Sequence, residues 1–394
     1  MADAVLALNA GSSSLKFAVY RNVSGKIVPI SKGEVEEIGT APHFVARDSA
    51  GVVLIEKRWQ SETFARLLGE LLAWVDRHLG DDRLVGIGHR VVHGGRDYTA
   101  PVLVSGAVLT ALEALTPLAP LHQPHSLAPM RAIATLRPGL PQIACFDTAF
   151  HHTMPPVATR FALPREYEDA GVRHYGFHGL SYEYIAGRLR DVAPRLAAGR
   201  VIVAHLGNGA SLCAMRAGVS IDTTMTFTAL DGLVMGTRCG AIDPGVLLYM
   251  AQQRNLSPDD IEHLLYEKSG LLGVSGLSGD MRVLLASDLP RAREAIELFV
   301  FRVARETAAL AASLGGLDGF IFTAGIGEHA PEIRAAVCER LRWLGVVPGS
   351  PKGSLIDGSR ISAPGSQVEV HVIPTDEDAM IGQHTVETIA ARVA

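Results

Sequence analysis

Two short apolar runs flank a small polar turn at the start of the chain. Residues 5–8 and 17–20 are apolar, and Asn-Ala-Gly-Ser-Ser-Ser-Leu-Lys stands between them, from Asn9 to Lys16. This alternation predicts a β-hairpin. Glycine lets a ligand approach the backbone closely, and successive N–H groups of such a turn can hold an anion. The pattern therefore favours a hairpin that holds an anion such as phosphate, with a plain surface turn as the alternative.

Further along the chain, the spacing of apolar positions switches between the strand and helix periods. Apolar residues three and four apart predict helices, and short apolar runs that end in glycine or aspartate predict buried strands. Serines before a helical pattern are typical N-caps, and Pro331 is well placed to begin a helix. The pattern predicts strands up to about residue 54 and at 85–92, 142–146, 200–206 and 319–323, helices at 64–79, 126–136, 181–190, 290–314 and from Pro331, N-caps at Ser61, Ser126 and Ser181, a stop at Gly80, and a Gly-rich loop after Thr323.

Strands mixed with helices in this way predict an α/β fold with ligands at strand ends. One strand-and-turn unit also recurs far along the chain. Leu8-Asn9-Ala10-Gly11-Ser12 has a counterpart in Leu206-Gly207-Asn208-Gly209-Ala210-Ser211. The recurrence favours two halves built alike, each with a phosphate loop, and chance similarity of glycine turns is the alternative.

Composition narrows the class of protein. Hydrophobic residues make up 48% of the 394 residues, and the net charge of −5 argues against a nucleic-acid-binding surface. The four cysteines lie far apart without C-x-x-C pairs, which is typical of free thiols in a reducing compartment. We find no signal-peptide pattern and no apolar run near the ~18 residues of a membrane span, so we expect a cytoplasmic protein that binds no membrane.

The common nucleotide-binding motifs are missing, but several Gly-rich loops carry arginine or histidine. There is no G-x-x-x-x-G-K-[ST] and no strand followed by G-x-G-x-x-G. The loops that replace them lie around Arg90, His122, His178 and Arg238. Arginine suits phosphate and carboxylate through its planar fork, so these loops together favour phosphoryl chemistry. A zinc site at His89 and His93 or at His174 and His178 is disfavoured because the flanking residues predict strand and loop.

Acidic residues follow two of the expected strands. Asp147 ends the strand at 142–146, and Asp376, Glu377 and Asp378 follow an apolar run at 370–373. Mg²⁺ binds through one or two carboxylates together with substrate phosphates. These positions therefore indicate a magnesium site.

At this point the chain closely resembles the acetokinase family of acetate, propionate and butyrate kinases. Seven segments match in the family's order, from one end of the chain to the other. They are residues 8–16, 89–95, 146–151, 175–179, 205–211, 232–238 and 322–328.

The resemblance implies the fold shared by acetate and sugar kinases and actin, which is similar to ribonuclease H, with two similar α/β domains flanking a nucleotide cleft. It implies an N-terminal domain of residues 1–150 with the C-terminal helix, 379–394, packed back on it. Residues 151–378 would form a nucleotide-binding domain that makes a homodimer. The implied reaction is Mg²⁺-dependent transfer of phosphate from ATP to acetate, which gives acetyl phosphate and ADP reversibly; Mn²⁺ is a possible substitute.

The family's functional residues carry over to matching positions in this chain. The implied catalytic residues are Arg90, His122, Asp147, His178 and Arg238. The implied metal-site residues are Asn9 and Glu377, and the implied acceptor pocket is formed with Arg90 by Val92, Leu121, Phe177 and Ala229. The implied nucleotide residues are Ser12, Ser14, Lys16, His205, Leu206, Gly207, Asn208, Gly209, Asp280, Met281, Arg282, Gly325, Ile326, Gly327, Glu328 and His329.

Three positions depart from the family pattern. His329 replaces the usual asparagine, which affects the expected nucleotide contacts, and Asp376 adds a negative charge beside Glu377. Ala229 replaces the usual proline of the methyl pocket. The smaller side chain opens room for about one methylene, worth ~0.8 kcal/mol when buried, and predicts easier use of propionate.

Simple acid–base chemistry agrees with these roles. Acetate is already ionised at neutral pH because carboxyl pKa values lie near ~4, so the nucleophile needs no general base. Positive charge around the transferred group is needed instead. We therefore expect Asp147 to orient an arginine or a metal-bound water rather than to take a proton.

Two other classes of protein remain as alternatives. An ATPase or phosphatase on the same fold would use water as acceptor and would need no apolar pocket. A non-catalytic, actin-like nucleotide-binding protein would not need Arg90, His178 and Arg238 together.

Overall fold

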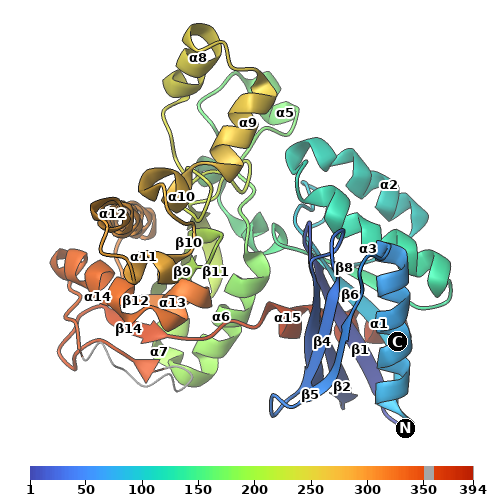
Figure 1. Cartoon of the computed structure of the whole chain (residues 1–394). Coiled ribbons are helices and arrows are strands. Elements are labelled where there is room, and N and C mark those ends of the chain that lie inside the picture. The colour runs from blue at the N-terminus through green and yellow to red at the C-terminus, as the bar shows by residue number, and fades with distance from the viewer. Residues whose placement is uncertain (350–358, 394) are drawn as a thin grey trace. The chain divides into compact units, whose positions relative to one another are not determined.

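The computed structural model describes residues 1–349 and 359–393 (Figure 1). The chain divides into two compact units. Unit 1 comprises Met1–Ala149 and the C-terminal residues from Asp376, and unit 2 comprises Phe150–Thr375. The divisions thus fall at 149/150 and 375/376, whereas the sequence placed them at 150/151 and 378/379.

Unit 1 contains an eight-stranded sheet in the order β5-β4-β3-β2-β1-β6-β8-β7. The predicted opening hairpin is confirmed, since β1 and β2 pair antiparallel with Ala10 opposite Leu15. Strands β6 and β8 then continue the sheet in parallel with β1. The strands are β1 (Asp3–Ala10), β2 (Leu15–Val23), β3 (Lys26–Glu36), β4 (His43–Asp48), β5 (Val53–Arg58), β6 (Arg83–Val91), β7 (Val102–Leu103) and β8 (Gln142–Phe146).

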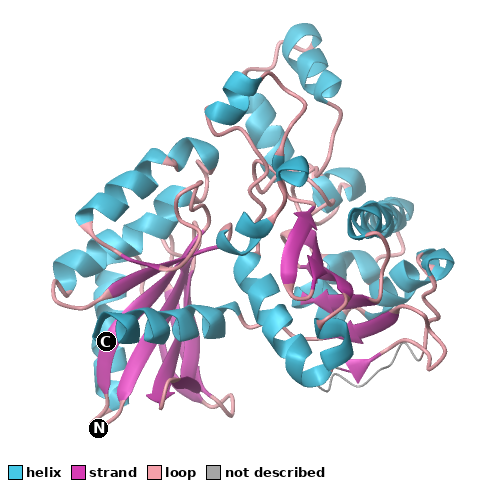
Figure 2. Ribbon diagram, turned by 180° about the vertical axis from the view of Figure 1, so that it is seen from behind, coloured by secondary structure: helices cyan, strands magenta, loops and turns pink. Residues whose placement is uncertain are grey.

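Helices cover both faces of this sheet (Figures 1 and 2). On one face lie α1 (Phe64–Leu79), α2 (Gly106–Ala114) and α3 (Gln123–Leu136), and the rings of Phe17, Phe44 and Trp74 meet edge to face in the core beneath α1. The other face carries α15 (Glu377–Val393) against β1 and β6. This helix approaches closely because β6 has glycine there: a Cβ on Gly88 would lie 2.2 Å from the Oγ1 of Thr385.

Unit 2 contains a six-stranded sheet in the order β11-β10-β9-β12-β14-β13. Helices α6 and α7 pack on one face, and the long α12 packs against β9, β10 and β11. The strands are β9 (Arg200–Leu206), β10 (Ala210–Arg216), β11 (Val219–Thr223), β12 (Gly319–Thr323), β13 (Ser359–Arg360) and β14 (Glu369–Val372). The helices are α4 (Pro156–Thr159), α5 (Arg165–Asp169), α6 (Gly179–Val192), α7 (Pro194–Ala197), α8 (Pro244–Gln253), α9 (Pro258–Glu267), α10 (Gly270–Ser275), α11 (Met281–Leu285), α12 (Pro290–Leu314), α13 (Ala324–His329) and α14 (Pro331–Arg340).

The two sheets share one topology. In each, three consecutive antiparallel strands are followed by two parallel strands, so that β3-β2-β1-β6-β8 corresponds to β11-β10-β9-β12-β14. The recurrent strand-and-turn units occupy equivalent places, between β1 and β2 and between β9 and β10. The prediction of two halves built alike is confirmed.

The predicted N-caps are wrong at all three helices. Thr63, His122 and His178 precede the helices instead. In α3 the proline after Gln123 fits the first turn, so the helix begins before Ser126. The Ser181 hydroxyl is buried and contacts His205 and Thr375, so it does not cap α6.

The predicted Gly-rich loop after Thr323 is also wrong, because residues 324–329 form the short helix α13. By contrast, the bounds of β8, β9, β12 and α12 agree with the sequence prediction. The four cysteines are free, as expected. Nowhere in the described part of the chain is there a helix long and apolar enough to cross a membrane.

Candidate active site

Parallel strands place the unit 1 candidates at one sheet edge. Asn9 lies near the end of β1, Arg90 near the end of β6, and Asp147 directly after β8. Register pairs Leu8 with His89 and Arg90 with Cys145, so these strand ends stand side by side. Carboxyl ends of parallel strands are where α/β proteins bind ligands.

A paired contact joins Arg90 to Asp147 at this sheet edge. Arg90 Nε lies 3.0 Å from both carboxylate oxygens of Asp147, and Nη2 donates to Oδ2 at 2.7 Å. Arg90 Nη1 also lies 3.3 Å from the Oδ1 of Asn9, and Nε lies 3.7 Å from the Oε2 of Glu377. Burial opposes the charge, but the Asp147 and Glu377 carboxylates outweigh it and raise the pKa of Arg90, so the guanidinium stays charged.

The first turn of α15 adds acidic groups to this edge. Glu377 and Asp378 stand there, and Asp376 precedes them. Burial raises the pKa of Asp378 to about 7, and the Asp376 and Glu377 carboxylates add to the shift, while Lys16 and Arg90 oppose it. Like charges crowded at one place are the arrangement that a bound cation would relieve.

The predicted phosphate turn of unit 1 is open to solvent. Gly11 donates its N–H to the carbonyl of Ser14 at 2.8 Å, which closes the turn. Ser12 and Lys16 are exposed and Ser14 is half-buried. Lys16 pairs across the hairpin with Asn9, so its charge belongs to the same strand end.

The segment that carries His122 is anchored from below by a residue that the sequence analysis did not single out. Gln123 is completely buried, and its Nε2 donates to the carbonyl of His93 at 3.0 Å and of Leu112 at 3.1 Å. Leu121, beside His122, is 40% exposed, and Val92 is half-buried. The predicted apolar residues of unit 1 are thus accessible to a ligand.

In unit 2, a stacked histidine pair lies at the start of α6. His178 and His205 have ring centroids 4.1 Å apart and nearly parallel planes. His178 Nδ1 shares a hydrogen bond of 2.8 Å with the Ser211 hydroxyl, which also bonds to Tyr182. These contacts fix the ring so that Nε2 is directed at Gly209, whose Cβ, if present, would lie 3.3 Å away.

The loop before His178 is shaped by a second buried histidine. His151 contacts the carbonyl of Phe177 through Nε2 at 3.0 Å and the Ser220 hydroxyl through Nδ1 at 2.9 Å. Gly176 has φ +80°, and a Cβ there would lie 2.5 Å from the His151 ring. Burial lowers the pKa of His151 to about 4, so the ring is neutral at pH 7.

Arg238 lies beside the same glycine turn. Its Nη1 donates to the carbonyl of Ala229 at 2.9 Å, and a Cβ on Gly209 would lie 3.7 Å from that nitrogen. Four residues of unit 2 therefore lie together near the C-terminal end of β9 and the start of α6. They are His178, His205, Gly209 and Arg238. Phe177 is buried and Ala229 is half-buried near them in sequence.

A pocket of about 420 Å³ opens next to the β9–β10 turn. Its walls come from three segments that are far apart in sequence and were all predicted to bind nucleotide. The lining residues are Gly207, Asn208, Gly279, Asp280, Met281, Arg282, Leu285, Gly325, Ile326, His329 and Ala330.

Glycine makes this convergence possible. A Cβ on Gly236 would lie 2.1 Å from the Oδ1 of Asn208, and one on Gly279 would lie 2.8 Å from the Gly236 carbonyl. The remaining predicted nucleotide residues of unit 2, His205, Leu206, Gly209, Gly327 and Glu328, do not line the pocket. Gly279, Leu285 and Ala330 do line it, although the sequence analysis did not predict them. The only signal that could have found them is their closeness in sequence to predicted residues.

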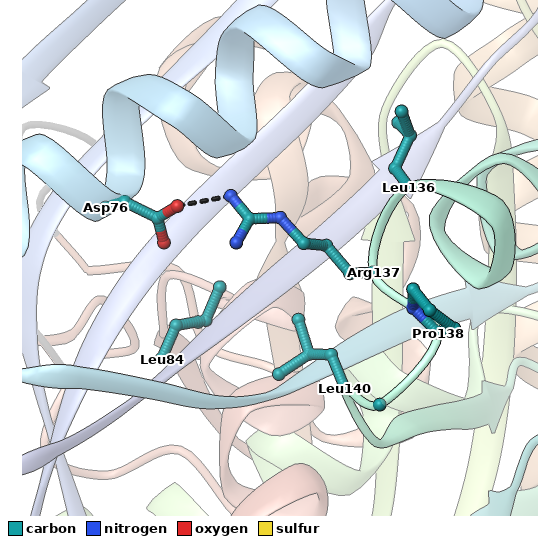
Figure 3. A pocket seen from close by; sticks show the side chains of 7 residues that line it. Asp76, Leu84, Leu136, Arg137, Pro138 and Leu140 are labelled. Atoms are coloured by element: carbon teal, nitrogen blue, oxygen red, sulfur yellow. Dashed lines mark hydrogen bonds and ion pairs between the residues drawn. The ribbon is translucent and has the colours of Figure 1, made fainter.

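A second pocket, of about 370 Å³, lies in unit 1 between α1 and the α3–β8 connection (Figure 3). Leu84, Leu136 and Leu140 surround an ion pair between Asp76 and Arg137. No predicted site residue lines it. Both charged side chains already satisfy each other, so this pocket offers no specific group to a ligand.

The acidic edge of unit 1 has few metal ligands, which suits Mg²⁺ better than a metal ion that is coordinated by protein side chains alone. Within residues 1–349 and 359–393, no group of three or more His, Cys, Asp or Glu side chains is arranged as a metal site. Asn9 and Glu377 nevertheless supply side-chain oxygens that could ligate a metal ion, and both lie close to Arg90. Since Mg²⁺ keeps waters and takes substrate phosphates as ligands, few protein donors are needed.

Comparison with known proteins shows the family of this chain. The Acetokinase family model matches residues 4–383. The acetate kinases of Rhodopseudomonas palustris (strain ATCC BAA-98 / CGA009) and Rhizobium meliloti are 55% and 48% identical to the chain, over 98% and 99% of both sequences respectively. Among solved structures, a propionate kinase from Francisella tularensis is similar with a TM-score of 0.90 and 36% identity, covering 98% of this chain and 99% of that one. Porphyromonas gingivalis acetate kinase is similar with a TM-score of 0.87 and 35% identity, covering 98% and 100%.

The family match and the acetate kinases at 55% and 48% identity define the class of this protein, a phosphotransferase with a carboxyl group as acceptor. The chain belongs to the acetokinase family. The predicted fold class, the two-unit α/β architecture of acetate kinases, is confirmed, as are the predicted family and enzyme class.

Proposed function

We propose that this protein transfers the γ-phosphoryl group of ATP directly to acetate, in line and reversibly, to form acetyl phosphate and ADP. Membership of the acetokinase family gives the class of reaction. The observation that carries the proposal is the 420 Å³ pocket, because three segments expected to bind nucleotide, within residues 207–208, 279–285 and 325–330, converge on it. We assign the nucleotide to this pocket, with Asp280, Met281 and Arg282 on one side and Gly325, Ile326 and His329 on the other.

The phosphate groups would meet the two glycine turns. Backbone N–H groups at Asn208 and Gly209 follow β9, while that of Gly207 donates within the turn to the Gly209 carbonyl. Ser12, Ser14 and Lys16 stand at the equivalent turn of unit 1. Successive N–H groups and a lysine neutralise phosphate without side-chain crowding. His205 and Leu206, at the end of β9, support this turn rather than line the pocket.

For the transfer itself, we assign charge stabilisation to Arg90, Arg238, His178 and His122. The attacking acetate is an anion, so cationic groups around the transferred phosphoryl lower the barrier more than a base would. Asp147 orients Arg90, an assignment supported by the paired contacts of both its oxygens with that guanidinium. Asp147 is therefore a positioning residue here and takes no proton.

Mg²⁺, or Mn²⁺ in its place, would be held by Asn9 and Glu377 together with the nucleotide phosphates. When bound, the ion neutralises phosphate charge that the arginines alone leave uncovered. Asp376 stands beside Glu377 and adds to the local negative potential, which with burial raises the pKa of Asp378 to about 7.

For the acceptor, we propose that Arg90 binds the carboxylate and that Val92, Leu121, Phe177 and Ala229 surround the methyl group. Propionate is the second candidate substrate. The alanine at 229 favours it, and the similar solved structure from Francisella tularensis is a propionate kinase. Both acids share one mechanism and differ by a single methylene.

One assay separates these possibilities. The purified protein with MgATP and acetate, propionate or butyrate is trapped with hydroxylamine, and the acyl hydroxamate is measured. We expect hydroxamate with acetate, less with propionate and least with butyrate. ADP release without hydroxamate would indicate an ATPase. The absence of both ADP and hydroxamate would indicate a nucleotide-binding protein without catalytic activity.

We also propose a homodimer formed by unit 2 in the cytoplasm. No residue of α8 is buried, and Leu248 and Tyr249 on it are 59% and 56% exposed. An apolar helix face of this kind suits a second copy of the chain better than water. Light scattering should give twice the chain mass for the wild type and a shift toward monomer for Leu248→Lys, and cell fractionation tests the location.

A further inference from the structure

The carboxylate of Glu328 turns back onto the start of its own helix, α13. Its Oε1 accepts the backbone N–H of Ala324 at 2.7 Å, the N–H of Thr375 at 3.2 Å and the Thr323 hydroxyl at 3.4 Å. The side chain is only 13% exposed. We infer that Glu328 is a positioning residue that holds one wall of the nucleotide pocket and does not itself contact the nucleotide. This inference rests on the nucleotide site proposed above.

The backbone that Glu328 holds is strained. Ala324 has φ +63°, in the left-handed region that residues other than glycine rarely adopt. Such a conformation is unfavourable for an alanine, so it persists only where its surroundings fix it. The charged acceptor on the Ala324 N–H is the contact that fixes it, because hydrogen bonds to an ionised group are stronger than neutral ones.

The strained residue sits where the pocket wall begins. A Cβ on Gly207 would lie 3.8 Å from the methyl of Ala324, so α13 starts beside the β9–β10 turn. Gly325 has nothing within 4 Å of its Cβ position and lines the pocket together with Ile326. A change of φ at Ala324 would therefore move the wall itself.

The other end of α13 is clamped as well. Arg334 is 4% exposed, and its Nη1 donates to the carbonyls of Gly327 at 3.0 Å and Glu328 at 2.7 Å. With both ends held, a helix of six residues keeps one orientation although it is far too short to be stable alone.

Glu328 also connects this wall to the histidine pair. Thr375, whose N–H it accepts, shares a hydroxyl contact of 2.9 Å with Ser181, and Ser181 contacts His205 Nδ1 at 2.8 Å. His205 stacks on His178. A chain of hydrogen bonds thus runs from the pocket wall to His205, and a ring stack continues it to His178, the ring assigned to the transferred phosphoryl.

The test compares Glu328→Ala, Ala324→Gly, the double variant and Glu328→Gln, with the dissociation constant for MgADP measured by calorimetry. Glu328→Ala should weaken binding about tenfold, the factor that corresponds to ~1.4 kcal/mol. Glutamine keeps an acceptor oxygen and should retain most of the affinity. Ala324→Gly alone should bind as the wild type does, because glycine adopts φ +63° freely.

The double variant decides between positioning and direct contact. If Glu328 acts by holding Ala324, glycine at 324 should restore several-fold of the affinity that Glu328→Ala loses. No restoration, or wild-type affinity in Glu328→Ala, would overturn the inference. If Glu328→Ala does not fold, Glu328→Asp with and without Ala324→Gly is compared in the same way.

The kinetic pattern separates this inference from the proposed function. In Glu328→Ala the KM for ATP should rise while the KM for acetate stays unchanged. A wild type that binds MgADP but forms no acyl phosphate would refute the acyl kinase proposal, and the calorimetric comparison would still test the role of Glu328.

Discussion

Both carboxylate oxygens of Asp147 accept hydrogen bonds from the Arg90 guanidinium. The side chain of Asp147 is 2% exposed, and that of Arg90 is 22% exposed. A buried carboxylate committed in this way to an arginine orients that arginine and is poorly placed to accept a proton. Arg90 also lies near Asn9 and Glu377, with Nη1 3.3 Å from the Oδ1 of Asn9 and Nε 3.7 Å from the Oε2 of Glu377.

Replacing the cationic groups should abolish most turnover. We expect Arg90→Ala or Arg238→Ala to lower kcat about 10³-fold, ~4 kcal/mol, as for other arginines at transferred phosphoryl groups. Steady-state hydroxamate assays measure this. Each lysine variant is the control and should retain more activity than the alanine variant, and near-normal turnover of both alanine variants would refute the site assignment.

Asp147→Asn tests whether this residue positions Arg90 or takes a proton. The amide keeps one acceptor oxygen but loses the charge, so kcat should fall about 10²-fold or more, which is ~2.7 kcal/mol. The pH profile of kcat between pH 6 and 9 should keep its shape, because no proton is transferred to Asp147. Loss of an ionisation step from that profile would instead identify Asp147 as a base.

Gly176→Ala should disturb the loop that carries His178. The new Cβ would lie 2.5 Å from the His151 ring and 2.8 Å from Thr223, at φ +80°. We expect a lower Tm and a loss of kcat. Gly187→Ala is the matched control, since nothing lies within 4 Å of its Cβ position in α6 and alanine should stabilise that helix by about 1 kcal/mol. A Gly176→Ala variant as stable and active as the wild type would contradict this.

Acid should destabilise the fold through its buried histidines. Burial lowers the pKa of His89 to about 4, while Gln142, its partner at 2.9 Å, opposes the shift. Between pH 6.5 and 4 the unfolded chain binds this proton and the folded chain does not. The free energy of unfolding therefore decreases as the pH is lowered from 6.5 to 4, by up to ~3 kcal/mol for this residue.

Urea unfolding as a function of pH measures this effect. His89→Leu should be less stable than the wild type at pH 7 because Gln142 loses its partner. Its stability should fall less steeply between pH 6.5 and 4, and equal slopes for the two proteins would assign the acid sensitivity to other groups.

Ala229→Pro should shift preference toward acetate. Proline keeps the carbonyl that Arg238 contacts and fills about one methylene, ~0.8 kcal/mol or roughly fourfold in the ratio of kcat/KM for acetate over propionate. An unchanged ratio would show that neighbouring side chains already fill the space beside Ala229.

Local patterns in the sequence predicted the opening hairpin, several other strands and the helices α1, α3, α6, α12 and α14, whereas α2, α8 and α9, among others, carried no prediction. The bounds of β8, β9, β12 and α12 follow from apolar runs and helical spacing, which are set by residues near one another in the chain. The N-caps failed for a reason outside that range. Ser181 has the side chain of a typical cap, but its hydroxyl is engaged by His205 and Thr375, from distant parts of the chain.

The candidate site shows the same division. Motif matching identified Arg90, Asp147, His178 and Arg238 from their local sequence. It attached no role to Gln123 or His151, which anchor the segments bearing His122 and His178. His151 ends a segment that matches the family, 146–151, but its contact with Phe177 is visible only in the folded chain.

The sequence by itself thus determined the family, the strand-and-turn repeat and the kinds of residue at the strand ends, since all three are written in short stretches of chain. Only the tertiary structure decided what each side chain contacts. Glu328 lies within a segment expected to bind nucleotide, yet its carboxylate bonds to Ala324 and Thr375. A buried carboxylate needs hydrogen-bond partners. Thr375 can serve as one because β12 and β14 are neighbours in the sheet, which places residue 375 next to α13.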